Sequence, residues 1–512
     1  LDGTWKLCWG DGTRGRLGYV PEFTRHGKFD ASRYLDARVP GEVHLDLVRA
    51  GWIADPYVRG NVLAARWVEE CLWTYRREFS PPAALRQAQG KGVRSWLVFE
   101  AMDLAAAVFL NGAEVGRHAN AFRPCRLDVS GKLKAGRNVV QVVLDAGLYH
   151  AGDKPGQGYG GGEDSKLHRR HWLRQTQSQF SWDWSPRLMN VGLRGRVRLE
   201  WTADPVRVDA LVPLVEVAPD LASATVRVRL FAEGLRAAPV RGRLDVEVAG
   251  RKASVPVEVK PGLHAVEATV EVERPALWWP VGHGPQALHP VRATLTVAGR
   301  AVGERRTRIG FRRVRVNQDP HPVEGKHFVV EVNNKPVFLK GANLVPADMI
   351  PAALDAARYH TLVERALESN MNCLRVWGGG LYEADAFYDL CDEKGIVVWQ
   401  EFIYACAKYP MHEEAFHEEA KREAVHQIRR LAAHPSLAIW CGNNEMEEGN
   451  WHWGYGKGVA HPDYAFFHLT VPRLLREEDP TRYYQPSSPY SPDHLDPNRP
   501  EVGDQHPWSV GF

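Results

Sequence analysis

The chain lacks the sequence motifs that build metal centres and disulfide frameworks. It has 7 cysteines in 512 residues, and they occur without a Cys-x-x-Cys pair or a repeating spacing. Its 21 histidines form neither a His-Glu-x-x-His motif nor a cluster with cysteine. The sequence therefore predicts reduced, buried thiols, no bound metal and no cofactor.

Long apolar runs, a signal-like start and Asn-x-Ser/Thr acceptors are also lacking. The 65 Lys and Arg nearly balance the 62 Asp and Glu, and the net charge of +3 predicts neither a nucleic acid nor a membrane as partner. These features favour a cytoplasmic enzyme. Because residue 1 is Leu, the sequence leaves open a leader that was removed, and it does not indicate the oligomeric state.

Aromatic residues, by contrast, are plentiful. The 18 Trp and 16 Tyr have flat faces that pack against the apolar faces of sugar rings as readily as against core neighbours, although we expect most of them in the core. A chain of 512 residues is too long for one core. We predict three domains.

Residues 1–201 predict an all-β domain. Short alternating segments, such as 95–100 and 107–110, are broken by Gly, Pro and Asn, and Asn111-Gly112 between apolar runs is a strong hairpin signal. A stretch from 151 to 186, rich in Gly and charge at its start, departs from this pattern and is interpreted as a long functional loop. The outcome expected for the domain is a β-sandwich.

Residues 202–316 show a cleaner alternation, for example at 224–230, 266–272 and 292–297. The length is close to the roughly 100 residues of immunoglobulin-like modules, although the Cys and Trp signature of antibody domains is missing. An immunoglobulin-like β-sandwich is therefore predicted from the architecture alone.

After residue 317 the pattern changes to alternating strands and helices, which indicates parallel strands joined by right-handed crossovers. Strands are predicted at 336–341, 373–377, 396–399 and 437–440, and helices at 358–370, 384–394 and 413–433. A complete eightfold (β/α)8 TIM barrel takes about 250 residues. Residues 317–512 thus predict the N-terminal part of a catalytic TIM barrel that is truncated.

Glu445 is the most informative single residue. It follows the apolar run Leu437 to Trp440, and residues at the carboxyl ends of buried parallel strands face the catalytic mouth of a barrel. The neighbouring amides of Asn443 and Asn444 can hold a sugar hydroxyl, the backbone or the glutamate itself. A helix N-terminus, where Asn caps and Glu favours the dipole, explains the same residues equally well.

Other predicted strand ends carry polar or aromatic groups that suit a polyhydroxylated ring: Asn343, Arg375, Trp377, Gln400 and Glu401. Arg375 has two equally weighted interpretations, a sugar-binding donor or a structural partner of a buried acid such as Glu401. Glu401 is expected to be a support rather than a catalyst. The run Gly378 to Gly380 lacks phosphate-loop spacing and predicts a tight turn.

No Gly-x-Ser-x-Gly elbow is present, so the sequence points to carboxylate chemistry rather than serine chemistry. Glycoside hydrolysis needs two carboxyls, one to protonate the leaving oxygen and one to attack the sugar or activate water. In this sequence only Glu445 is a clear candidate for one of these two carboxyls.

Several motifs, in order along the chain, resemble glycoside hydrolase family 2, and within it the β-mannosidases. Those of the first two domains are Val39 to His44, Phe99 to Gly112, Phe180 to Pro186, Leu277 to Pro280 and Ile309 to Arg312. Those of the third are Lys340 to Asn343, Arg375 to Gly380, Trp399 to Phe402 and Trp440 to Glu445. The resemblance implies that the first domain is a jelly roll like that family's sugar-binding domain.

The resemblance also implies a retaining, exo-acting enzyme that removes terminal β-linked mannose from a β-mannoside or manno-oligosaccharide. Glu445 would be the general acid and then the general base, and Asn444 would bind the sugar near its 2-hydroxyl. Trp182 and Asp183 would reach in from the first domain, and Arg375 would support the carboxylates. Two further tryptophans are predicted to contact the substrate, Trp377 at the mouth and Trp453, or else Trp451, as a sugar platform.

The family's nucleophile is a second glutamate after the seventh strand of the barrel, and we expect it beyond residue 512. Glu477, Glu478 and Glu501 lie too early and lack the motif, so this chain alone is expected to be inactive. A β-galactosidase or β-glucuronidase of the same family and a non-catalytic carbohydrate-binding protein are the alternatives. The sequence does not indicate the natural aglycone.

Overall fold

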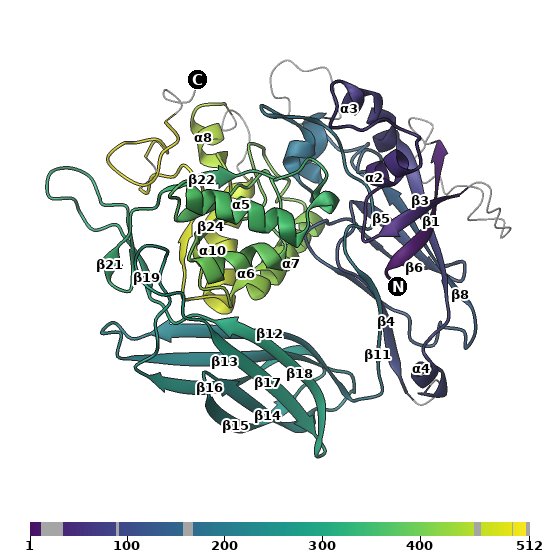
Figure 1. Cartoon of the computed structure of the whole chain (residues 1–512), viewed down its shortest axis with the longest axis horizontal. Coiled ribbons are helices and arrows are strands. Elements are labelled where there is room, and N and C mark those ends of the chain that lie inside the picture. The colour runs from purple at the N-terminus through teal and green to yellow at the C-terminus, as the bar shows by residue number, and fades with distance from the viewer. Residues whose placement is uncertain (12–33, 89–91, 157–166, 455–461, 494, 508–512) are drawn as a thin grey trace. The chain divides into compact units, whose positions relative to one another are not determined.

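The computed structural model describes residues 1–11, 34–88, 92–156, 167–454, 462–493 and 495–507. The chain divides into two compact units. The first holds Leu1–Ala203 together with Pro346–Asp355, and the second holds Asp204–Val345 together with Ala356–Phe512. Figure 1 shows mainly strands in the first unit, and a β-sandwich followed by alternating strands and helices in the second.

The first unit is built on antiparallel sheets, as the sequence predicts. One sheet has the order β2-β1-β3-β8-β5-β6, formed by Leu35–Val39, Gly3–Asp11, Cys71–Phe79, Asn138–Asp145, Ala105–Leu110 and Ala113–His118. Another has the order β11-β4-β7, formed by Val197–Thr202, Arg94–Phe99 and Cys125–Asp128. Along β5 every second side chain is buried, because successive side chains of a strand point to opposite faces.

The turn between β5 and β6 lies where the sequence predicts it. Asn111 and Gly112 have φ angles of 54° and 87°, the left-handed conformation that both central residues of a two-residue hairpin turn need. Asn111 also donates from Nδ2 to Asn138 Oδ1 (3.0 Å) and accepts from the Val139 N–H (3.0 Å). The turn side chain therefore fastens the hairpin to β8.

The segment Pro346–Asp355, which the sequence-based division counts in the third domain, makes its contacts with the first unit. Ile350 is fully buried in a small core with Val62 and Leu188. The Asn190 amide donates to the Met349 carbonyl (3.0 Å). The buried side chain of Ile350 and the backbone carbonyl of Met349 therefore both hold this segment in the first unit.

The second unit begins with an antiparallel β-sandwich. One sheet has the order β12-β13-β16, formed by Val206–Val217, Ser223–Gly234 and Gly262–Glu273. The other has the order β15-β14-β17-β18, formed by Arg251–Val259, Val240–Val248, His289–Val297 and Arg300–Ile309. Alternate valines and leucines of both sheets, such as Val226 and Leu244, are fully buried in one core. This is the sandwich that the alternation predicts.

A parallel sheet follows, with the order β22-β23-β24-β25-β26. The strands are Gly341–Leu344, Cys373–Val376, Val397–Glu401, Leu437–Cys441 and Tyr483–Gln485. Helices α5 (Ala356–Glu368), α6 (Asp385–Lys394) and α7 (Glu414–Leu431) connect the first four strands, within two residues of the predicted bounds. The connection to β26 contains α8 (Met446–Trp451), α9 (Pro462–Ala465), the π-helix η6 (Phe466–Thr470) and α10 (Val471–Glu478). All neighbouring strands are parallel, so their carboxyl ends share one edge.

The predicted strand at 336–341 is wrong. The chain there continues an antiparallel arm formed by β19 (Val314–Asn317), β20 (Val329–Val332) and β21 (Lys335–Pro336), and the Val337 N–H donates to the Val330 carbonyl (2.8 Å). The first parallel strand is β22, which starts at Gly341. A Cβ at Gly341 would lie 2.0 Å from the Cys373 carbonyl oxygen, so a glycine is needed where β22 meets β23.

The sandwich and the parallel sheet share buried residues at their junction. Trp278, 1% exposed, belongs to the core of the sheet with Trp399 and Ile439, and its indole N–H donates to the Asp392 carbonyl (2.8 Å). The buried Arg312 guanidinium donates to the carbonyls of Pro435 and Leu437, both at 2.7 Å. These contacts give a structural role to two motifs that the sequence singles out, Leu277 to Pro280 and Ile309 to Arg312.

Candidate active site

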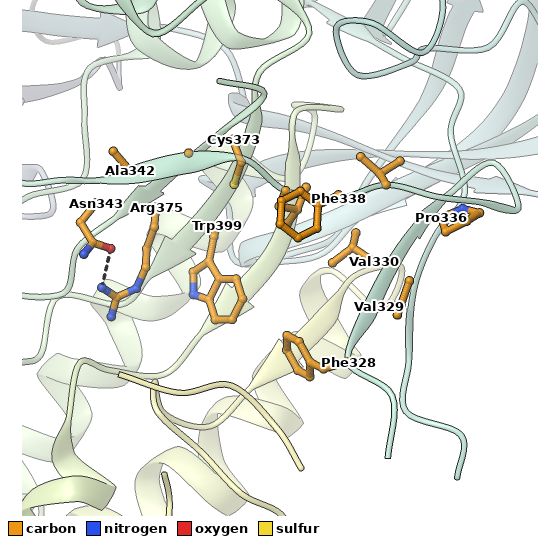
Figure 2. A pocket seen from close by; sticks show the side chains of 13 residues that line it. Phe328, Val329, Val330, Pro336, Phe338, Ala342, Asn343, Cys373, Arg375 and Trp399 are labelled. Carbon is orange, nitrogen blue, oxygen red and sulfur yellow. Dashed lines mark hydrogen bonds between the residues drawn. The ribbon is translucent and has the colours of Figure 1, made fainter. Parts of the chain in front are cut away.

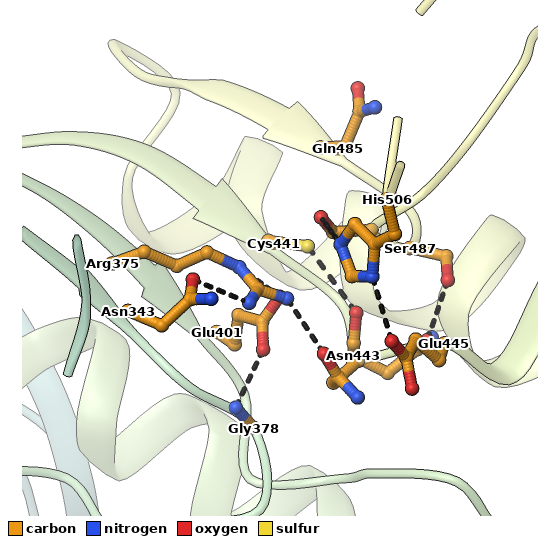
Figure 3. A network of polar contacts seen from close by, with 12 residues as sticks. Asn343, Arg375, Gly378, Glu401, Cys441, Asn443, Glu445, Gln485, Ser487 and His506 are labelled. Carbon is orange, nitrogen blue, oxygen red and sulfur yellow. Dashed lines mark hydrogen bonds and ion pairs between the residues drawn. The ribbon is translucent and has the colours of Figure 1, made fainter. Parts of the chain in front are cut away.

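Polar side chains gather at the carboxyl ends of the parallel strands, as Figure 3 shows. Asn343 comes from β22, Arg375 from β23, Glu401 from β24 and Glu445 from the turn after β25. His506, from the segment after β26, completes the group. The strand-end prediction is therefore confirmed for Asn343, Arg375, Glu401 and Glu445, which meet at this edge. Gln400 does not join them, because its Oε1 accepts from the Tyr388 hydroxyl of α6 (2.6 Å).

Arg375 is the hub of the group, and its side chain is 13% exposed. Its guanidinium donates to Glu401 Oε1 from Nη2 (2.6 Å) and Nε (3.1 Å). It also donates to Asn343 Oδ1 (2.9 Å) and Asn444 Oδ1 (2.8 Å). Burial lowers the pKa of Arg375, but the charge and hydrogen bond of Glu401, together with Cys441 and Asp504, raise the pKa above its usual value. The structural interpretation of Arg375, as partner of Glu401, is confirmed.

Glu401 is fully buried. Its Oε1 accepts from Arg375, and its Oε2 accepts from the Gly378 N–H at 2.5 Å. Burial raises the pKa of this carboxyl, yet every donor around it favours the ionised form, so we assign a paired carboxylate. A Cβ at Gly378 would lie 2.5 Å from the Tyr404 carbonyl oxygen, which explains why a glycine stands there.

Glu445 has an unusual backbone conformation for a residue with a side chain. Its φ of 61° is left-handed, and its N–H donates to the Ser488 carbonyl (2.8 Å). It is the residue before α8, but its side chain caps no backbone N–H of that helix. The cap is instead Asn443, whose Oδ1 accepts from the Met446 N–H (3.2 Å). Asn443 therefore supplies the helix cap, and the catalytic role of Glu445 stays a prediction.

The Glu445 carboxyl is 7% exposed and lies between two side chains. Its Oε1 is 2.8 Å from His506 Nδ1, and its Oε2 accepts from the Cys406 thiol at 3.2 Å. Burial raises the pKa of Glu445, but the hydrogen bond and charge of His506, followed by Cys406 and Arg375, lower it below its usual value. This carboxyl is nearly buried, and its polar surroundings allow it to exchange a proton with a molecule bound beside it.

Asn444 lies between the same groups. Its Oδ1 accepts from Arg375, and its Nδ2 donates to Cys406 Sγ (3.4 Å). Its backbone bridges Ala405 on one side and Ser488 on the other. The turn that carries Asn444 and Glu445 is therefore held by the turns that follow β24 and β26.

Sequence reasoning missed Cys406 and His506 as site residues. Cys406 counted only as one of the scattered cysteines, and the stretch Gly503 to Trp508 led to no site prediction. His506 is followed by Pro507 and Trp508, a pattern that gives no sign of a partner 61 residues earlier. β26 was missed as well, because Tyr483–Gln485 is too short and too polar to form an apolar run.

The tryptophans that the sequence predicts to contact the substrate differ in their exposure. Trp377 is 6% exposed, and a Cβ at Gly379 would lie 1.8 Å from its ring. The predicted turn at 378–380 is confirmed, with the Gly380 N–H donating to the Trp377 carbonyl (3.0 Å). Trp451 and Trp453 are 51% and 41% exposed. A role for Trp377 or Trp453 in substrate binding stays a prediction.

Trp182 and Asp183 belong to the first unit. Trp182 ends the short strand β9 (Phe180–Trp182), which pairs with β10 (Ser185–Arg187), and the Arg170 guanidinium lies 5.1 Å from its ring centroid. Asp183 is exposed. Their contribution to substrate binding stays a prediction. Part of the loop predicted at 151–186, residues 157–166, lies outside the described residues.

One group of metal-ligand type occurs among the described residues, formed by Asp389, Asp392 and His434. Asp392 accepts from the Ser436 N–H (3.0 Å) and lies 2.6 Å from His434 Nδ1, while Asp389 pairs with Arg308 (3.2 Å). These protein partners account for the group. No helix in the described parts of the chain is long and apolar enough to cross a membrane.

A hollow of about 680 Å³ borders the polar group on the β22 side (Figure 2). Asn343, Arg375 and Trp399 form its polar end, where the strands finish. Apolar residues of the arm, of β22 and of β23 form the rest, together with Phe338 between the arm and β22, which is 82% exposed. The hollow joins an open apolar surface to the group around Arg375.

Comparison with known proteins agrees with this arrangement. A β-mannosidase B of Thermothelomyces thermophilus is 35% identical over 96% of this chain and 58% of its own length. The crystal structure of a β-D-mannosidase from Dictyoglomus thermophilum superimposes with a TM-score of 0.87 and 33% identity, over 100% of this chain and 60% of that one. An exo-chitosanase of Amycolatopsis orientalis has the same fold, with a TM-score of 0.72 and 18% identity over 97% of this chain and 54% of its own.

The chain thus spans somewhat more than half the length of the relatives that it matches. Two family descriptions match the β-domains. Residues 22–195 match the galactose-binding domain-like part of glycosyl hydrolase 2, and residues 206–312 match the domain described as glycosyl hydrolases family 2. The chain belongs to glycosyl hydrolase family 2.

Proposed function

We propose that the whole protein is a retaining, exo-acting β-mannosidase that removes terminal β-D-mannose from β-mannosides, with Glu445 as its general acid and base. The observation that carries the proposal is the Glu445 carboxyl, held at the shared strand edge between His506 and Cys406 and next to Asn444. The choice of mannose as the sugar is based on the relatives named as β-mannosidases.

In this mechanism Glu445 first gives its proton to the glycosidic oxygen as the bond to the anomeric carbon breaks. A second carboxylate attacks that carbon, and the Glu445 carboxylate then takes a proton from the water that releases mannose. Arg375 would hold Asn444 and Glu401 in place, so that the Asn444 amide can meet a sugar hydroxyl.

Three other carboxyls near Glu445 are already engaged, and we do not propose any of them as the nucleophile. Glu401 is paired with Arg375, Glu448 accepts from the Asn498 amide, and Asp504 accepts from Ser488 and Gln485. The family resemblance places the nucleophile after the seventh strand of a barrel, in sequence beyond this chain. This assignment is part of the proposal.

We also propose that the parallel strands are part of a (β/α)8 barrel. In this proposal residues 1–201 form a jelly-roll domain, residues 202–316 an immunoglobulin-like domain and residues 317–512 the N-terminal part of the barrel domain. The order β22 to β26, with α5, α6 and α7 between the first four strands, is that of consecutive barrel units. Further strands paired to β22 would cover the apolar hollow of Figure 2.

Glu445→Gln in the whole protein tests the function. Without the acid, hydrolysis of an alkyl β-mannoside should fall by about 10²- to 10⁴-fold, because a poor leaving group needs the proton. A dinitrophenyl β-mannoside should still form the glycosyl-enzyme, and azide should accelerate its turnover, since an anion needs no base.

Glu447→Gln is the matched control, because Glu447 lies two residues away and its carboxylate contacts His468 (2.8 Å). This variant should keep the parent activity on both substrates. Equal hydrolysis of the alkyl mannoside by Glu445→Gln and the parent would refute the assignment. A panel of aryl galactosides, glucuronides and mannosides identifies the sugar.

A further inference from the structure

A chain of polar contacts runs from Glu445 through His506 and Ser488 to Asp504. His506 Nδ1 faces Glu445 Oε1 at 2.8 Å, and His506 Nε2 lies 3.1 Å from Ser488 Oγ. The Ser488 hydroxyl donates to Asp504 Oδ2 at 2.6 Å. Ser488 is 2% exposed, so the middle of the chain is shielded from water.

The direction of each proton follows from the contacts of Asp504. Its Oδ1 accepts from the Gln485 amide (2.7 Å) and the Tyr490 N–H (2.9 Å), while Oδ2 accepts from Ser488. Burial raises the pKa of Asp504, but the three donors that face its oxygens favour the carboxylate. Because Ser488 has one proton and gives it to this carboxylate, its oxygen can only accept from His506 Nε2. His506 therefore carries a proton on Nε2.

With Nε2 protonated, the remaining proton of the pair lies between His506 Nδ1 and Glu445 Oε1. It rests either on the carboxyl, with both groups neutral, or on the imidazole, as an imidazolium beside a carboxylate. A state with no proton there would bring the lone pair of Nδ1 against a carboxylate oxygen at 2.8 Å. The geometry thus favours a pair that keeps one shared proton.

We propose that His506, oriented by Ser488 and Asp504, is a positioning residue that stores the catalytic proton of Glu445. The proposal rests on the proposed function of Glu445. When the glycosidic oxygen begins to leave, the proton moves from Nδ1 to Oε1 and then to that oxygen, which leaves a neutral imidazole and a carboxylate. When water attacks later, the same two groups take the proton back.

His506 is also fixed from its backbone. Its N–H donates to Asn498 Oδ1 (2.9 Å), and the Asn498 amide donates to Glu448, on the helix that begins directly after Glu445. Both partners of the pair are therefore tied to one short stretch of the chain. This rigidity keeps the 2.8 Å contact between Nδ1 and Oε1.

Other ionisable groups that act on this pair come from each surrounding element: Arg375, Glu401, Cys406, Glu448 and Asp504. After the effect of burial, His506 contributes most to the lowered pKa of Glu445. The shared proton therefore belongs to the pair rather than to either residue alone.

His506→Gln in the whole enzyme tests the proposal through the pH profile of kcat/KM. If the pair stores the proton, its removal leaves Glu445 to titrate alone, and the alkaline limb should move down by about 1 to 2 pH units. If His506 only lowers the pKa of Glu445, the limb should move up. A limb that moves up or stays in place overturns the proposal.

His468→Gln is the matched control, because His468 Nε2 contacts Glu447 Oε1 at the same 2.8 Å. It should leave the alkaline limb in place. Ser488→Ala removes the acceptor of Nε2 without touching Glu445, and it should shift the limb in the same direction as His506→Gln but less. An unchanged limb in Ser488→Ala contradicts the orienting role of Ser488.

A spectroscopic measurement needs no substrate and stays valid if the proposed function fails. Long-range ¹H–¹⁵N spectra of the ¹⁵N-histidine protein, with His506→Gln to assign the signal, report which ring nitrogens carry protons. We expect Nε2 protonated at every pH, and in Glu445→Gln as well. A neutral His506 with its proton on Nδ1 alone would overturn the proton assignment.

Discussion

At the scale of single residues, the strained backbone of Glu445 decides where its side chain points. A left-handed φ of 61° costs a residue with a Cβ of the order of 1 kcal/mol or more. The bond from its N–H to the Ser488 carbonyl holds it there. In this conformation the carboxyl faces His506 and Cys406. The strain is thus tied to the proposed acid role.

Arg375 and Glu401 are a second residue-scale feature. Replacing one member of a buried ion pair leaves an uncompensated charge, which costs about 3–5 kcal/mol. The planar Arg375 guanidinium also donates hydrogen bonds to the side-chain oxygens of Asn343 and Asn444. A lysine ammonium is not planar and cannot reproduce this set of bonds. Stability and site geometry therefore depend on the same guanidinium.

Arg375→Met should lower the free energy of unfolding of the second unit by about 3–5 kcal/mol, because Glu401 stays buried without its cation. Adding Glu401→Gln should recover part of this loss, since the buried charge disappears. Urea titrations followed by tryptophan fluorescence measure both. Arg308→Met is the control. Its partners Asp389 and Glu393 are exposed, and it should cost less than about 1 kcal/mol.

The same loss in Arg375→Met and Arg308→Met would contradict a buried, uncompensated Glu401.

Predicting the site from sequence reached Glu445, Asn444, Arg375 and Glu401, because each lies at or shortly after the carboxyl end of an apolar strand. It could not reach Cys406 or His506. Their contacts with Glu445 bridge 39 and 61 residues, and neither residue belongs to a periodic pattern.

At the scale of elements, the end of β25 depends on a glycine. A Cβ at Gly442 would lie 2.1 Å from the Pro486 carbonyl oxygen and 2.6 Å from the Tyr484 hydroxyl. Both belong to β26 and the turn after it. Three residues later Glu445 bonds to Ser488, so the close approach at Gly442 sets the spacing of the two turns.

Gly442→Ala should push these turns apart and weaken the bonds from Glu445 N to Ser488 O and from Ser488 N to Asn443 O. Losing two such bonds costs about 1–3 kcal/mol, so these amides should exchange with deuterium roughly 5- to 100-fold faster. Hydrogen exchange with mass spectrometry measures this. Gly136→Ala is the control, because a Cβ there meets nothing within 4 Å. Unchanged exchange of the Glu445 and Ser488 amides in Gly442→Ala would refute the role of the glycine.

Elements with strong periodicity were predictable, and short ones were not. The helices α5, α6 and α7 carry apolar faces at helical spacing and lie within two residues of their predicted bounds. The apolar run at 336–341 was misassigned, because an arm strand and a barrel strand look alike in sequence. β26 has three residues, and its pairing with β25, rather than a pattern in its own sequence, makes it a strand.

At the scale of the whole molecule, the second unit joins a β-sandwich to a parallel sheet. On β13, Arg229 donates to the Glu477 carbonyl (3.0 Å) and contacts the Glu478 carboxylate (3.4 Å). From α7, Arg429 donates to both Glu478 oxygens (2.9 and 2.6 Å) and lies 3.8 Å from the ring centroid of Phe231. Sandwich and sheet thus share charged and aromatic partners, as well as the buried Trp278.

These shared contacts predict that the sandwich and the sheet unfold together. In hydrogen exchange under increasing urea, peptides of β14 and of β25 should open at the same concentration. Arg229→Met removes the donor of two backbone carbonyls and should lower stability by about 1–3 kcal/mol, so that peptides of the sandwich open before those of the sheet. Arg243→Met is the control, because Arg243 and its partner Asp245 are exposed on β14, and it should change neither opening. Separate opening of β14 and β25 in the parent protein would show that the junction does not couple them.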